Sequence, residues 1–161
     1  MATIVVEDGS IVEDANSYCS VLDLQTYCSD RNITLEGDES SLLIQAMDYI
    51  EQLDFIGYRA TDEQELEWPR KNVVIDCREF PDNEIPKQLK LGQMATAVAI
   101  DQGNSPLNVI TSAVKREKVD VLEVEYASNA ISNPIDPNIN NYLKKLLNIG
   151  NNGYQFKVSK A

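Results

Sequence analysis

Hydrophobic residues recur at helical spacing in two early stretches of the chain, and this periodicity predicts two amphipathic helices. The first follows Ser20, which can form a capping box with Asp23, and it is expected to end near Arg31. Its apolar face consists of Val21, Leu24, Tyr27 and Cys28. The second helix is predicted over residues 41–53 with Ser40 as its cap. Its apolar face consists of Leu42, Leu43, Ala46, Met47, Ile50 and Leu53.

A third helix is predicted to be the central and most buried one. It opens at Pro86, because proline suits the first turn of a helix, and it ends near Gln102, where Gly103 supplies a left-handed ending. Small residues allow close approach of a neighbouring helix at Gly92, Ala95, Ala97 and Ala99. A short fourth helix is expected after a cap at Asp136, with Pro137 in its first turn. Its apolar positions are Ile139, Tyr142, Leu143, Leu146 and Leu147.

Alternation of apolar and polar residues predicts short β-hairpins in two other places. Residues 3–12 hold two apolar runs on either side of Asp8-Gly9, a pair that tolerates a tight turn. Residues 109–127 hold a second pattern, in which apolar residues alternate with glutamates. One face of this second hairpin is therefore expected to contact water.

These patterns together predict a mainly α fold with small β-hairpins (α+β). We expect a bundle of three to four helices with an inserted β-hairpin near 109–127 and an extended C-terminal tail. The helical domain is placed at 1–149 and the tail at 150–161. Because the tail alternates apolar and polar residues, it is typical of a strand, yet the chain offers it no obvious partner.

The composition fits one soluble domain, since the 161 residues are 43% hydrophobic and 25% charged. No apolar run approaches the roughly 18 residues needed to cross a bilayer. The N-terminus also lacks the basic and apolar regions of a signal peptide. We therefore expect a protein that is assembled in the cytoplasm and has no membrane partner.

Charge is acidic overall and unevenly distributed. The chain has 14 Lys and Arg against 26 Asp and Glu, for a net charge of −12. All of the acids lie at or before Asp136, and the residues beyond it carry Lys144, Lys145, Lys157 and Lys160. Negative charge on the body opposes the counterion release that drives binding to a phosphate backbone. General nucleic-acid binding is thus disfavoured, and the basic tail is expected to have a partner of its own.

The residue types for common catalytic and metal sites are missing. The chain has no histidine, which excludes Ser-His-Asp and Cys-His arrangements. Cys19, Cys28 and Cys77 have neither zinc-site spacing nor an even number, and we interpret them as buried free thiols. No Gly-rich phosphate loop is present, and the calcium-loop-like start at Asp136 lacks the required glycine and glutamate. We expect no enzyme activity and no cofactor.

The only tryptophan lies in a Trp68-Pro69-Arg70 corner. Pro69 has a fixed φ and favours an extended conformation at Trp68, so the indole is positioned by the backbone. We interpret Trp68 as a structural anchor in the core in preference to a direct contact with a partner. Two roles stay open for Arg70, an ion pair with the acidic run before it or a bridge to a neighbouring subunit. The following residues, 72–83, are predicted to form an extended loop.

Several motifs occur in an order that resembles one known family. They are Val6-Glu7-Asp8-Gly9, Ala15-Asn16-Ser17-Tyr18-Cys19-Ser20, Leu43-Ile44-Gln45-Ala46 with Tyr49-Ile50, Gln64-Glu65-Leu66-Glu67-Trp68-Pro69-Arg70, Ile85-Pro86, Val114-Lys115-Arg116-Glu117-Lys118-Val119 and Leu122-Glu123-Val124-Glu125-Tyr126. In this order the chain resembles tailed-phage head–tail connector proteins, also called adaptor or head-completion proteins. Some members of that family carry a label of DnaT-like single-stranded-DNA binding.

The resemblance implies a structural virion protein of the phage neck. It implies a ring, usually of twelve subunits, that sits on the portal protein, extends the DNA channel and contacts the stopper or tail protein. Packaged double-stranded DNA would pass through such a ring without specific binding, because an acidic lumen repels phosphate. In this family the C-terminal segment reaches the portal, where a strand could add to a sheet edge. The candidate docking residues are Tyr154, Phe156, Lys157, Val158 and Lys160.

Two alternatives remain beside this interpretation. The C-terminal segment could instead be a disordered or self-packed terminus. The whole chain could instead be a single-stranded-DNA-binding module of the DnaT-like kind. Such modules combine a positive groove with aromatic side chains on which bases stack. Because the aromatic residues here lie mostly in the acidic part of the chain, we rank this function below assembly.

Overall fold

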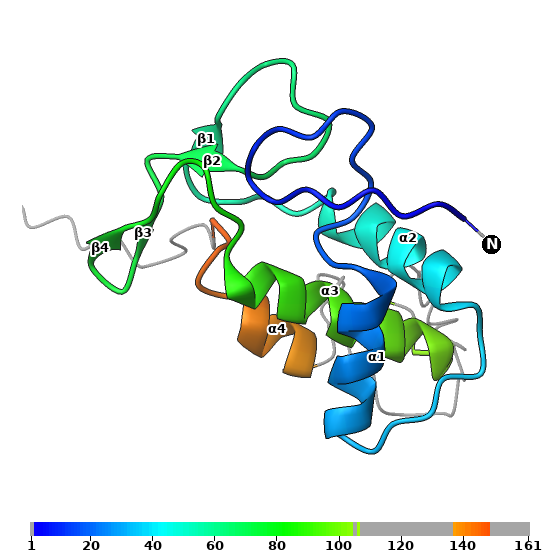
Figure 1. The fold of residues 1–161 in the computed structure, drawn as a ribbon. Helices are drawn as coiled ribbons and strands as arrows, with labels where there is room; N and C mark the ends of the chain where they lie inside the picture. Colours follow the sequence, from blue (N-terminus) through cyan, green and yellow to red (C-terminus); the bar gives the residue numbers. More distant parts are fainter. Residues whose placement is uncertain (1, 105, 107–136, 149–161) are drawn as a thin grey trace, which may run out of the picture.

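A computed structural model describes residues 2–104, 106 and 137–148. Within these ranges lie four helices: α1 (Val21–Asp30), α2 (Glu39–Ile50), α3 (Lys87–Asp101) and α4 (Pro137–Leu143) (Figure 1). Two antiparallel sheets of two strands each pair β1 (Tyr58–Arg59) with β2 (Arg70–Lys71) and β3 (Val74–Ile75) with β4 (Arg78–Glu79). The predicted mainly helical α+β fold with small hairpins is confirmed. The predicted hairpin at 109–127, the cap at Asp136 and the tail at 150–161 lie outside the described residues.

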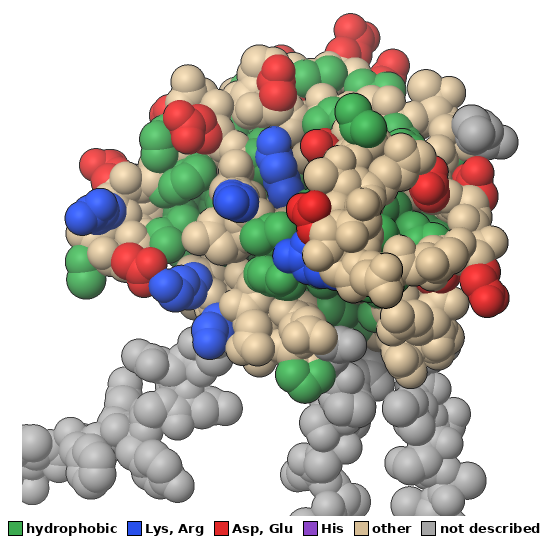
Figure 2. Space-filling view, turned by 60° about the horizontal axis from the view of Figure 1, so that its bottom comes forward, with side chains coloured by type: hydrophobic (Ala, Val, Ile, Leu, Met, Phe, Trp, Pro, Cys, Tyr) green, Lys and Arg blue, Asp and Glu red, His purple; other side chains and the backbone are tan. Residues whose placement is uncertain are grey.

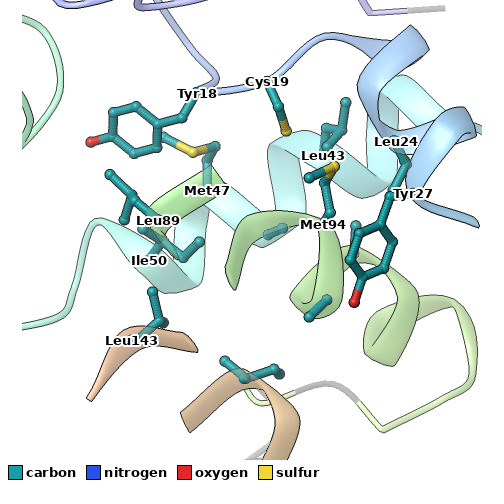
Figure 3. Packing of buried hydrophobic residues seen from close by; sticks show 14 of the residues in the cluster. Tyr18, Cys19, Leu24, Tyr27, Leu43, Met47, Ile50, Leu89, Met94 and Leu143 are labelled. Carbon is teal, nitrogen blue, oxygen red and sulfur yellow. The ribbon is translucent and has the colours of Figure 1, made fainter. Parts of the chain in front are cut away.

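Helix α3 occupies the centre of the domain, and it packs against both α2 and α4 (Figure 1). Its buried residues are Leu89, Gly92, Gln93, Met94, Ala95, Thr96, Ala97, Val98 and Ala99. Glycine at position 92 allows the close approach of α4, because a Cβ there would lie 2.5 Å from Cδ2 of Leu143. Figure 3 shows side chains from α1, α2, α3 and α4 meeting in this shared core.

Helix α4 is also tied to the loop that follows α2. The amide of Ile56 donates to the carbonyl of Leu146 at 2.9 Å, and the amide of Asn148 donates to the carbonyl of Asp54 at 2.8 Å. The buried side chains that this segment adds to the core are Ile139, Leu143 and Leu146. The last described part of the chain is thus an integral layer of the domain.

The start of α1 agrees with its sequence signal. The Ser20 hydroxyl accepts from the amide of Asp23 at 3.1 Å, and the Asp23 carboxylate accepts from the amide of Ser20 at 2.7 Å. Both bonds of the capping box are therefore present, and they satisfy amides that the helix itself leaves free. The helix ends at Asp30, close to the predicted end.

The predicted bounds and cap of the second helix are wrong. It runs over Glu39–Ile50, and its cap is Asp38, whose carboxylate accepts from the amide of Ser41 at 2.9 Å. Ser40 is buried inside the first turn. The physical reason is that the carboxylate of Asp38 is as good a cap as a serine hydroxyl and lies two residues earlier. Leu53, expected on the helix, follows in a turn.

The predicted hairpin at residues 3–12 is not formed. In its place the chain wraps around the carboxylate of Glu7, which accepts from the amides of Gly9, Ile11 and Val12 at 2.8, 3.1 and 2.9 Å. The one β-bridge of this segment joins Val6 to Ser17 in a parallel sense. A side chain thus takes the hydrogen bonds that a second strand would have taken.

The interpretation of residues 72–83 as an extended loop is also wrong, because they contain the hairpin of β3 and β4. The turn between these strands holds Asp76 and Cys77 at φ values of 51° and 62°. Cys77 is exposed in this turn, so its interpretation as a buried thiol is wrong, whereas Cys19 and Cys28 are buried. Two consecutive residues with positive φ are the geometry of a tight hairpin turn. This conformation usually calls for glycine or asparagine, so a turn at Asp76-Cys77 is hard to predict from the sequence.

Candidate nucleic-acid interface

A groove of about 370 Å³ lies between α1 and the first half of α3. Three cationic side chains line it, Arg31 at the end of α1 and Lys87 and Lys90 on α3. Arg31 and Lys87 are exposed and Lys90 is half-buried. No one of the three forms an ion pair with a residue in the described ranges. We call the groove defined by Arg31, Lys87 and Lys90 the basic groove.

Helical geometry explains why these cations share one groove. Lys87 and Lys90 are three residues apart, so they project from the same face of α3. Arg31 follows the last turn of α1, and its Nη1 donates to the carbonyl of Tyr27 at 3.1 Å. The apolar floor of the groove consists of Cys19, Leu91 and Met94.

Arg31 also lies over an aromatic ring. Its Cζ is 3.7 Å from the centroid of the Tyr27 ring, which is cation–π distance. Burial raises the pKa of the Tyr27 phenol to about 12, and its hydrogen bond with Tyr142 acts in the same direction. The phenol therefore stays neutral over the working pH range, and it holds the guanidinium in place through its ring.

A second groove of about 270 Å³ lies on the other side of this pair and shares Tyr27 and Arg31 with the first. Its other polar and aromatic lining residues are Gln102, Asn138 and Tyr142. Together the two grooves bring together the three cations of the basic groove, the side-chain amides of Gln102 and Asn138, and the aromatic rings of Tyr27 and Tyr142. In Figure 2 the Lys and Arg side chains lie over the left and centre of the view, with Asp and Glu both among them and at the margins.

Acidic residues limit what the basic groove can attract. Asp23 and Asp30 also line it. Asp23 is engaged in the capping box with Ser20, whereas Asp30 is exposed. The groove thus carries one more positive than negative side chain. The whole chain has a net charge of −12, so a groove with a net charge of +1 can attract an anion only weakly.

The Trp68-Pro69-Arg70 corner lies away from this groove, in the core. Trp68 is fully buried and meets Phe55 and Phe80 edge to face, with ring centroids 5.9 and 6.2 Å apart. The peptide bond between Trp68 and Pro69 is cis. Through these two ring contacts Trp68 anchors the corner in the core.

Arg70 forms its ion pair within the chain. Its Nη1 lies 2.5 Å from Oε2 of Glu67, and its other donors reach the carbonyls of Phe55, Ile56 and Gly57. Two roles were open for Arg70, an ion pair with the acidic run before it and a bridge to a neighbouring subunit. The structure contains the ion pair with the acidic run. With 8% of its surface exposed, Arg70 is a clamp on the loop after α2.

A buried polar chain links this corner to the start of α1. The Tyr18 hydroxyl donates to Glu51 at 2.5 Å and accepts from the amide of Trp68 at 3.2 Å. The other carboxylate oxygen of Glu51 accepts from the amide of Glu67 at 2.8 Å. Burial raises the pKa of the Glu51 carboxyl, and the nearby Glu67 adds to this, while the two hydrogen bonds oppose it.

The raised pKa of Glu51 predicts a pH effect on stability. The folded state binds the Glu51 proton more tightly than the unfolded chain does. The stability that this proton contributes is therefore fully present below the ordinary carboxyl pKa and is lost as the pH rises through the raised pKa of the folded state. The unfolding free energy of the wild type minus that of Glu51→Gln should therefore increase as the pH is lowered across this window. Urea unfolding at a series of pH values measures it. Glu65→Gln, an exposed neighbour, is the control, and an equal trend in both variants would refute the assignment.

The predicted docking residues Tyr154, Phe156, Lys157, Val158 and Lys160 lie outside the described residues. The residues of the basic groove, in turn, were not identified from the sequence. Their signal was present in the spacing of Tyr27 to Arg31 and of Lys87 to Lys90, which places each pair on one helix face. What the sequence did not contain was the packing of α1 beside α3.

Metal-binding clusters and membrane-spanning helices are both absent from the described ranges. Residues 2–104, 106 and 137–148 hold no group of three His, Cys, Asp or Glu that could bind a metal ion. No helix in these ranges is long and apolar enough to span a bilayer. The described residues thus form a small helical domain with a groove lined by three cations.

A family model described as "Putative DnaT-like ssDNA binding protein" matches residues 2–161. The chain belongs to this family. No curated protein and no solved structure matches the chain.

Proposed function

We propose that this protein binds single-stranded DNA and that the basic groove contacts the phosphates. The family description supports the activity. The place is supported by the cations Arg31, Lys87 and Lys90, which form no ion pair within the described residues. The observation that carries the proposal is their convergence on one groove of an otherwise acidic domain. A guanidinium over an aromatic ring also offers a surface on which a base can stack.

The expected affinity is modest and depends weakly on salt. Each phosphate contact on a single strand adds about −0.7 to the slope of log K against log salt concentration. Three cations therefore predict a slope of about −2. In the sequence analysis, single-stranded-DNA binding ranked below assembly because the body of the chain is acidic. That ranking used the overall charge and gave no weight to a local cluster of cations.

The test is the reversal of Lys87 and Lys90 in the double variant K87E/K90E. Binding of a fluorescein-labelled oligothymidine, measured by anisotropy at low salt, should weaken by about tenfold or more, since each lost charged contact contributes about 1 kcal/mol. The matched control R78E/K144E changes the net charge equally but alters exposed cations outside the groove. Equal losses in both variants would refute the site, and absence of salt-sensitive binding by the wild type would refute the activity.

A second candidate is a structural role as a ring in the phage neck. It is favoured by the excess of acid, because the described residues hold 21 Asp and Glu against nine Lys and Arg. Such a surface would let packaged DNA slide past without adhering. The family description supports the first candidate and contains nothing about a virion.

The neck role predicts a docking function for the tail. Removal of residues 151–161 should abolish binding to the portal protein and leave the helical content unchanged. Negative-stain electron microscopy of the protein mixed with portal should show a ring for the full chain only. Monomers that never join the portal, or undiminished binding by the truncated chain, would count against it.

A further inference from the structure

The loop between β1 and β2 presents a row of carboxylates. We call residues 61–67 the acidic loop. Asp62, Glu63 and Glu65 are exposed, and none of them pairs with a cation in the described part of the chain. Three like charges close together on one loop repel each other, so they favour a cationic partner.

The acidic loop is held rigid from inside. Gln64 is 3% exposed, its Oε1 accepts from the amide of Thr61 at 2.9 Å, and its Nε2 donates to the carbonyls of Leu66 and Pro69 at 2.7 and 3.1 Å. The guanidinium of Arg59 donates to the carbonyl of Gln64. With its backbone fixed in this way, the loop loses little entropy when its carboxylates bind.

The acidic loop lies on the other side of the domain from Arg31, at one end of the basic groove. In Figure 1 the chain between β1 and β2 rises at the top, whereas α1, which Arg31 follows, ends at the bottom. The loop therefore cannot cover the groove of its own chain as far as Arg31. It can reach that of a second copy placed above or below it.

We propose that the acidic loop of one copy binds in the basic groove of the next. The carboxylates of Asp62, Glu63 and Glu65 then meet the cations of Arg31, Lys87 and Lys90, in a groove whose net charge is +1 because Asp23 and Asp30 also line it. The contact uses a different surface on each partner, so it repeats head to tail and gives a closed ring or an open chain. It does not require DNA binding, although DNA and the acidic loop compete for the same groove.

Long-range electrostatics opposes this association, because each copy carries a charge of −12. At about 0.15 M salt, interactions beyond about 8 Å are largely screened while direct contacts persist. The association is therefore best measured at physiological ionic strength. Complementary charges then determine which surfaces meet.

The test uses two full-length variants and their mixture. The loop-reversed variant is D62K/E63K/E65K and the groove-reversed variant is K87E/K90E. Sedimentation velocity should show concentration-dependent association of the wild type, and each variant alone should associate about tenfold or more weakly. An equimolar mixture should regain association, because each variant then supplies the surface that its partner lacks. Circular dichroism checks that both remain folded.

Each outcome is decisive. A wild type that stays monomeric into the millimolar range overturns the proposal, as does a mixture that behaves like its components. Oligothymidine binding separates this result from the DNA proposal, since the loop-reversed variant keeps the basic groove and should bind DNA at least as well as the wild type. Failure of DNA binding alone leaves the self-association result unaffected.

Discussion

Replacement of Trp68 by alanine should lower the free energy of unfolding by about 3–5 kcal/mol, which is the usual cost of removing a buried large aromatic side chain. Whole domains are stable by only about 5–15 kcal/mol, so this single change should bring the protein close to unfolding at 37 °C. Trp68 is fully buried, and it is the ring that joins Phe55, next to α2, to Phe80, before α3. Its loss would leave a cavity between these two rings.

Thermal and urea unfolding followed by circular dichroism measure this effect. Trp68→Phe tests the cause, because the indole nitrogen has no hydrogen-bond partner among the described residues and phenylalanine therefore loses volume only. It should keep most of the stability. Tyr58→Ala, at an exposed aromatic on β1, is the control for aromatic loss. Near-wild-type stability of Trp68→Ala would refute the anchoring role.

Replacement of Glu7 by alanine should cost about 3 kcal/mol or more. The carboxylate is buried, and its removal leaves the amides of Gly9, Ile11 and Val12 without their acceptor. An unsatisfied buried donor costs about 1–3 kcal/mol. The loop also packs tightly on the rest of the domain, since a Cβ at Gly9 would lie 2.1 Å from the carbonyl oxygen of Asn83.

Urea unfolding gives the global cost, and hydrogen exchange of residues 2–17 gives its location. Asp8→Ala is the matched control, because this neighbouring carboxylate is exposed and bonds only to Ser10. It should have a much smaller effect. If the two variants are equally stable, the carboxylate of Glu7 does not organise the loop.

Helix positions were largely predictable because helical signals are local. Capping by Ser20 and Asp23, and the breaker at Gly103, act within one turn of chain, so the sequence contains them completely. The start of α2 was misplaced by two residues because two adjacent capping residues, Asp38 and Ser40, compete and only the folded backbone decides between them.

The β-structure was less predictable because its causes are not local. Asp8-Gly9 is a good hairpin signal, yet the preceding residue, Glu7, can satisfy the same amides with its side chain. Sheet β1–β2 depends on Arg70, which reaches carbonyls 13 to 15 residues earlier in the chain. No alternation pattern marks strands of two residues.

The candidate site was predictable only in part. The burial of Trp68 follows from its sequence context, whereas the basic groove requires knowledge of how α1 packs beside α3. Net charge was a misleading guide, because it averages over the surface and hides three cations that converge on one groove. The separation of acidic loop and basic groove likewise exists only in three dimensions.

The way α4 fits against α3 has a practical consequence for making shorter versions of this protein. A fragment that stops at Asn104 would lose Ile139, Leu143 and Leu146 and expose the apolar face of α3 on which they pack. Such a fragment should express as aggregates, since a large uncovered apolar surface promotes association. The shortest well-behaved version must therefore extend at least to Asn148, whose amide closes the last hydrogen bond to Asp54.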